Sequence, residues 1–203
     1  MEGQDYLNQI SAKARPVKKE KSGILHSKFF IVGAIGLIAL TIIIILGAIL
    51  GSNKGDEKNL AIKLAFHLEA TAEAIETYQP NLKSSELRSN SASLKSVLLD
   101  TNKNLTDYLA AKYDFKENKY KDLSAKADNA KEELETELFE AKINGYLDTA
   151  FAQKMAYEIS IIINEETTVH RKTGNSTLQE LLDKSYDSLE NLYDKFNDFS
   201  EAK

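Results

Sequence analysis

The sequence predicts an all-α protein in which one N-terminal transmembrane helix is followed by a compact antiparallel bundle of about five helices. Residues 29–51 are an uncharged run of 23 residues in a chain in which 28% of residues are charged. Beyond that run, apolar residues recur with helical spacing, and glycine and proline are scarce. We therefore expect a short, disordered, basic cytoplasmic tail over 1–28, a transmembrane helix over 29–51 and an extracytoplasmic helical bundle over 52–203.

The run from Phe29 to Gly51 is long enough to cross a membrane. As a helix it would measure about 35 Å, against about 30 Å for the hydrocarbon core of a bilayer. A buried core helix is one alternative, but the rest of the chain has no matching apolar mass. A cleaved signal peptide is another, but its apolar region is shorter and the segment after the run offers only a poor cleavage site. An uncleaved anchor is therefore the preferred interpretation.

Charges on the two sides of the run predict its orientation. Three Lys residues follow closely, at 54, 58 and 63, whereas six cations precede it: Lys13, Arg15, Lys18, Lys19, Lys21 and Lys28. Because flanking Lys and Arg stay in the cytoplasm, we expect a single-pass membrane protein with a cytoplasmic N-terminus and its C-terminal domain outside. The same cations could also attract anionic headgroups, although setting the topology is the simpler interpretation. Gly47 and Gly51 have the spacing of a helix-packing pair within the membrane.

The first two helices of the bundle are expected over 56–78 and 84–113. The first has a regular apolar stripe and ends before Pro80, because the residue preceding a proline avoids helical geometry. The second opens with weak helix formers in "SSELRSNSAS", and its first turns could fray. The segment "KYDFKEN" then indicates a connection.

The third and fourth helices are expected over 119–143 and 146–172. Asn144–Gly145 ends the third, whose stripe contains small residues that would allow a neighbouring helix to approach closely. The fourth has the broadest apolar face outside the membrane run, which predicts that it is the most central helix.

The fifth helix is expected over 176–200 and has the clearest amphipathic pattern. Gly174 is a natural residue for ending the previous helix in left-handed conformation. Ser176 and Gln179 fit a capping box, in which Ser caps the helix and Gln reaches back. Short connections favour a compact up-and-down bundle over the alternative, an extended coiled-coil stalk.

Catalytic, cofactor and metal motifs are missing from the sequence. The chain has no Cys, so it forms no disulfide, and its net charge of −5 argues against a nucleic-acid partner. His26, His67 and His170 belong to no metal-binding pattern, and His67 is expected to be a partly exposed side chain at a helix margin. The Glu groups at 132–140 and 164–166 are interpreted as solvated helix faces. We expect a non-enzymatic protein with no catalytic residues, no cofactor and no metal.

Four bulky aromatic residues on the fifth helix are the candidate partner surface. They are Tyr186, Tyr193, Phe196 and Phe199. Core packing is the simpler interpretation, but any part of this row that is exposed would favour protein binding, because aromatic residues dominate binding hot spots.

The segment "DYLNQISAKARPVKK", followed by a basic gap and an Ile-rich run, resembles the start of uncharacterised single-pass membrane-anchored proteins of small-genome epibiotic bacteria. The resemblance covers about the first 50 residues. It implies an envelope protein that faces outward, and it implies no activity and no functional residues.

These observations together favour a membrane-anchored envelope protein that presents a helical bundle for protein–protein contact, in a scaffold, assembly or adhesion role. Its expected partners are the lipid bilayer and either another envelope protein or a second copy. The main alternative is an extracytoplasmic sensor or small-ligand-binding bundle that acts through a partner. An unrecognised enzyme site and a role in disrupting the envelope are further alternatives.

Overall fold

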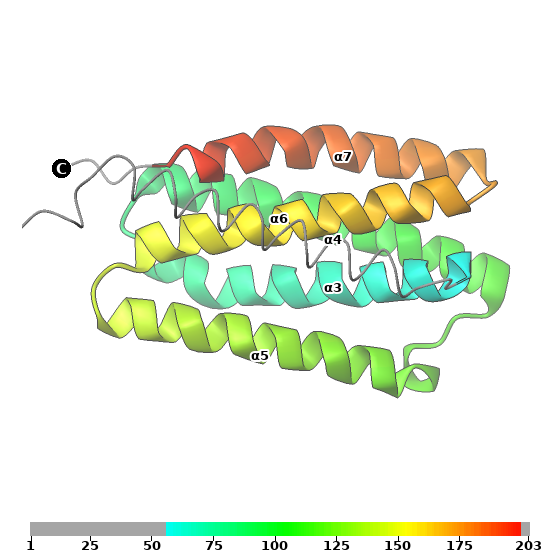
Figure 1. The fold of residues 1–203 in the computed structure, drawn as a ribbon, viewed down its shortest axis with the longest axis horizontal. Helices are drawn as coiled ribbons and strands as arrows, with labels where there is room; N and C mark the ends of the chain where they lie inside the picture. Colours follow the sequence, from blue (N-terminus) through cyan, green and yellow to red (C-terminus); the bar gives the residue numbers. More distant parts are fainter. Residues whose placement is uncertain (1–55, 200–203) are drawn as a thin grey trace, which may run out of the picture. The chain divides into compact units, whose positions relative to one another are not determined.

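The computed structural model describes residues 56–199, and this part of the chain is entirely α-helical apart from two short 3-10 turns and its connections (Figure 1). Its five long helices are α3 (Glu57–Tyr78), α4 (Ser85–Tyr113), α5 (Lys121–Ile143), α6 (Leu147–Lys172) and α7 (Ser176–Asn197). The prediction of an all-α bundle of five helices is thereby confirmed. The predicted tail, the predicted span from Phe29 to Gly51 and the Gly47–Gly51 pair lie outside the described residues. Among the helices of 56–199, none has the length and apolar character needed to cross a bilayer.

Successive helices run in opposite directions and form a compact bundle, not an extended stalk (Figure 1). Helices α3, α4, α7 and α6 pack in a ring of neighbouring pairs, and α5 lies against both α3 and α6. We call the end at which α3, α5 and α7 begin the entry end. The end at which α5 turns into α6 is called the far end.

Helix α3 is the most buried helix, so the prediction that the fourth helix, α6, would be the most central is wrong. Twelve of the 22 residues of α3 are buried, against ten of the 26 in α6. Five of the twelve are alanines, at positions 61, 65, 70, 72 and 74. Alanine adds little apolar area, and its small size lets neighbouring helices approach α3 from several sides.

The start of α7 differs from the predicted capping box. Asn175 is the N-cap: its backbone is extended and its Oδ1 accepts a hydrogen bond of 2.8 Å from the backbone N–H of Leu178. Ser176 is already helical, and the side chain of Gln179 donates to the carbonyl oxygens of His170 and Thr173. Asn caps as well as Ser does, which explains the shift of one residue. The left-handed ending predicted at Gly174 is also wrong, because α6 ends on extended Thr173 (φ −80°, ψ 138°) and Gly174 has no positive φ.

The turn between α5 and α6 has the geometry that "NG" predicts for the end of a helix. Gly145 has a φ of +84°, which a side chain would strain. The backbone N–H of Tyr146 donates to the carbonyl of Ala141 (3.0 Å), and that of Gly145 donates to the carbonyl of Lys142 (3.3 Å). This is a Schellman motif. It brings Tyr146 to the surface of the far end, directly after the last turn of α5.

Candidate interaction surfaces

The four aromatic residues that the sequence singled out on α7 do not form one exposed row. Phe196 is fully buried and packs against Phe151, with ring centroids 6.3 Å apart. Tyr193 and Phe199 are half-buried against the core. Tyr186 alone among the four is an exposed large apolar residue, with 37% of its surface accessible. Core packing, the simpler interpretation, therefore describes Phe196, and little of the row is available to a partner.

A different set of apolar residues is exposed at the far end. Phe139, Ile143 and Tyr146 have 55%, 65% and 49% of their surface accessible, respectively. Phe139 and Ile143 are four residues apart on α5 and therefore share one side of the helix. Tyr146 follows on the Schellman turn. We call these three residues the far-end patch.

The far-end patch could not be predicted from the periodic apolar stripe of α5, because Phe139 and Ile143 lie beside that stripe and not within it. Leu134, Leu138 and Ala141 are the buried residues of α5. Phe139 and Ile143 are not in register with that stripe, so the helix carries large apolar groups on a second side. The available signal was a phenylalanine within the acidic run "ETELFE", where a solvated face needs no aromatic ring.

The far end is also strongly acidic. The segments that form it, 76–88, 135–148 and 190–198, contain nine Asp and Glu against four Lys and Arg. Glu137 pairs with Lys154 of α6, whereas Glu140, next to Phe139, is exposed. The far-end patch therefore lies at the acidic end of the bundle, with the exposed Glu140 beside Phe139 and the exposed Lys142 beside Ile143.

His67 of α3 lies between two carboxylates of α6. Its Nδ1 is 2.8 Å from Glu165 Oε2 and its Nε2 is 2.9 Å from Glu158 Oε2. Lys63 completes the group, 2.8 Å from the other oxygen of Glu165. Burial alone would lower the pKa of His67, but the hydrogen bonds and charges of Glu158 and Glu165 outweigh burial and raise it to about 10. Conversely, burial would raise the pKa of Glu165, but His67 and Lys63 outweigh burial and lower it.

His67 is partly exposed, as predicted, with 18% of its side chain accessible. The interpretation of 164–166 as a solvated face is wrong, because 10% of the Glu165 side chain is accessible and Glu166 is buried. With His67 protonated, two positive charges meet two negative charges, and both ring nitrogens donate to carboxylates. A histidine in this state has no free nitrogen with which to accept a proton or bind a metal. No group of three or more His, Asp or Glu side chains within 56–199 could hold a metal ion.

Glu166, beside Glu165, belongs to a second polar group in the core. Ser185 of α7 donates to its Oε1 (2.6 Å), and Thr101 of α4 donates to Ser185 Oγ (2.9 Å). The other carboxyl oxygen has no hydrogen-bond partner among the described residues. Burial raises the pKa of Glu166 to about 8, so the carboxyl group is protonated at neutral pH. Both polar groups connect helices and lie within the bundle, which favours a structural role for them.

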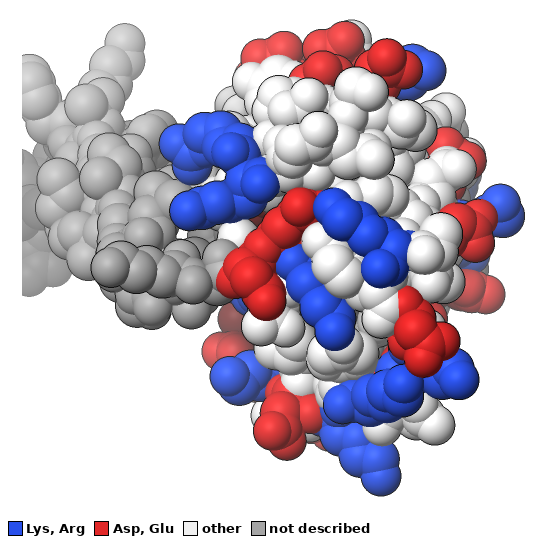
Figure 2. Space-filling model, turned by 90° about the vertical axis from the view of Figure 1, so that its right-hand side faces the viewer, with Lys and Arg blue, Asp and Glu red and all other residues white. Residues whose placement is uncertain are grey.

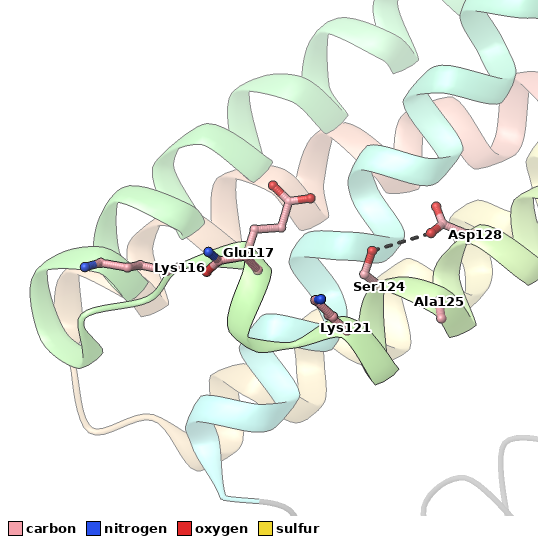
Figure 3. Close-up of a pocket in the computed structure, with 7 residues that line it drawn as sticks. Lys116, Glu117, Lys121, Ser124, Ala125 and Asp128 are labelled. Carbon is pink, nitrogen blue, oxygen red and sulfur yellow. Dashed lines mark hydrogen bonds between the residues drawn. The ribbon is translucent and has the colours of Figure 1, made fainter.

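Two hollows on the described bundle are open to solvent. The larger, about 660 Å³, follows the connection from α4 to α5 and is lined by polar and charged side chains (Figure 3). Ser124 points toward Asp128 within it, whereas Lys116 extends outward from the connection (Figure 3). The smaller, about 220 Å³, lies beside Glu166 between α6 and α7. Neither is enclosed in the way that is typical of small-molecule sites.

Comparisons with known proteins identify no relative whose function could be compared with that of this chain. No protein-family model matches the chain, and neither a curated protein nor a solved structure is significantly similar to it.

Proposed function

We propose that this is a membrane-anchored, non-enzymatic envelope protein whose bundle lies outside the cytoplasm and presents the far-end patch to a protein partner. The anchor would be the helix expected over 29–51, oriented by the six cations that precede it. The role would be that of a scaffold, assembly or adhesion module. The partner would be another envelope protein or a second copy of this chain.

The observation that carries this proposal is the exposure of Phe139, Ile143 and Tyr146 together on one acidic end of the bundle. Three large apolar side chains that are exposed to water do not stabilise the fold. Full burial of such a side chain would contribute about 1.5–3 kcal/mol to the free energy of folding or binding. Grouped exposed apolar residues with a polar rim mark interaction sites in soluble domains. The net acidic far end favours a partner whose apolar recess is accompanied by Lys or Arg.

The test is site-specific photo-crosslinking in cells that express the full-length protein. A photoreactive residue at Phe139 or Tyr146 is compared with one at Ser96, an exposed position of α4 away from the far-end patch. We expect one dominant crosslinked protein from the patch positions and none from Ser96. The product should disappear when Ile143→Asp is added, because a charge in the patch would have to be buried on binding.

The two kinds of partner are separated by the mass of the product. A crosslinked dimer of the chain would assign the patch to self-association, and a heterologous product would identify the partner. Equal, diffuse labelling from Ser96 and from the patch would contradict the proposal.

A further inference from the structure

The entry end of the bundle differs in charge from the rest of it. The segments that form this end, 56–60, 112–122 and 170–176, contain seven Lys and Arg against five Asp and Glu. The remainder of 56–199 contains 11 Lys and Arg against 22 Asp and Glu. A net positive surface thus lies at one end of a domain that is otherwise strongly negative. Figure 2 views the bundle from this end and shows Lys and Arg side chains spread across it.

Several of these cations are exposed and project from the turns. Lys116 and Lys119 share a single carboxylate, Asp114, at 3.8 and 3.2 Å. Lys121, Arg171 and Lys172 are exposed and take part in no ion pair with another residue of 56–199. Their charges are therefore available to an anionic surface outside the bundle.

Aromatic side chains accompany the cations. Lys58 lies over the rings of Tyr113 and Tyr120, 5.7 and 5.4 Å from their centroids. Tyr108 donates a hydrogen bond to Glu57, which also pairs with Lys112. Lysine beside half-buried tyrosine is a combination that suits the headgroup region of a membrane, where one end of each side chain is apolar and the other is solvated.

The length of the chain between the expected anchor and α3 limits how far this end can be from the membrane. Four residues separate Gly51 from Asp56. Even fully extended, that connection spans at most about 18 Å. With the proposed anchor, the entry end, at which α3 begins, would be tethered close to the membrane surface. The far end is about 35–40 Å from the entry end along the helices.

We infer that the entry end rests on anionic lipid headgroups, which fixes the bundle upright on the membrane. The inference rests on the proposed anchor, because only the tether holds a net negative domain at a negative surface. Attraction acts within a Debye length, about 8 Å at physiological salt, so it reaches the basic entry end. The acidic far end lies beyond that range and would be repelled only if the bundle tilted toward the surface.

The test uses the full-length chain in nanodiscs and exploits the lack of Cys in the sequence. A fluorophore is attached to Ala125→Cys, one turn into α5 at the entry end, or to Ser89→Cys, one turn into α4 at the far end. Quenching by a nitroxide on the lipid headgroup is measured in phosphatidylcholine and in an equal mixture with phosphatidylglycerol. We expect about twofold greater quenching at Ala125 in the anionic membrane, reversed by high salt, and little quenching at Ser89 in either.

Charge reversal provides the matched control. Lys116→Glu with Lys121→Glu should reduce quenching at Ala125 to its value in phosphatidylcholine. Lys142→Glu with Lys195→Glu, two exposed cations of the far end, should leave it unchanged. Equal quenching in the two membranes, or no effect of the entry-end reversal, would overturn the inference while leaving the anchor intact. A chain that is not recovered with the nanodiscs would instead contradict the anchor, and with it this inference.

Discussion

His67 and Glu166 are titratable residues whose protonation is coupled to folding. The pKa of His67 is raised from 6.5 to about 10, and that of Glu166 from 4.5 to about 8. Between each pair of values the folded bundle holds a proton that the unfolded chain has released, so raising the pH favours unfolding. The pKa of Glu165 is lowered instead, so its contribution is lost as the pH falls below about 4.5. For these three groups stability should therefore be greatest near pH 4.5, because the loss from Glu166 begins above that pH and the loss from Glu165 begins below it.

We expect the free energy of unfolding to fall by roughly 2–6 kcal/mol between pH 6 and pH 9, because each pKa unit of difference is worth about 1.4 kcal/mol. Urea denaturation of residues 53–203 at a series of pH values measures this change. In Glu166→Gln the fall should be smaller, since the amide does not titrate. A stability that is flat from pH 6 to pH 9 would contradict the assignment of these protons.

At the scale of the element, Asp148 in the first turn of α6 holds the connection between α3 and α4 in place. Its carboxylate accepts hydrogen bonds from the backbone N–H groups of Lys83 (3.0 Å) and Ser84 (2.7 Å), and Asp148 is itself buried. Ser84 is the N-cap of α4, so one side chain of α6 fixes the point at which another helix begins.

Replacing Asp148 with Ala should lower the free energy of unfolding by about 2–4 kcal/mol, because two backbone donors lose a charged acceptor. Asp148→Asn keeps one acceptor oxygen and should cost less. Thermal melts of the two variants and of the unmodified bundle provide the measurement. Equal melting temperatures for Ala and Asn would show that the hydrogen bonds contribute little.

Sequence reasoning succeeded where the information is local to an element. Pro80, Asn144–Gly145 and the 3.6-residue period place the helix boundaries within three residues of those observed. It failed for His67, whose partners lie 91 and 98 positions away, because no local pattern identifies which helix will face α3. It failed for the far-end patch for a related reason, since which side of α5 stays exposed depends on how α5 lies against α3 and α6.

Across the whole molecule, burial is unequally distributed among the helices. Helices α3, α4, α6 and α7 contain most of the core, whereas α5 buries only Leu134, Leu138 and Ala141. All three lie in its second half, and the first half, from Lys121 to Glu133, has no buried residue. Segments with few buried apolar contacts open at the lowest free energy.

Native-state hydrogen exchange should therefore show the amides of 121–133 exchanging at least about tenfold faster than those of α3. The second half of α5 is the internal control, because it contains all three buried residues of this helix. Uniform protection along α5 would indicate that this helix belongs to the same cooperative unit as the other four.

The odd number of long helices within 56–199 has a mechanical consequence. Because five antiparallel helices follow one another, α3 begins at one end of the bundle and α7 ends at the opposite end (Figure 1). A pull applied between residues 56 and 199 would run along the long axis and slide the helices past one another, loading many side-chain contacts at once. An even number would place both attachment points at the same end, where the same pull would peel the helices apart one contact at a time. A bundle of five helices would therefore resist a pull between its two ends more strongly than a bundle of four.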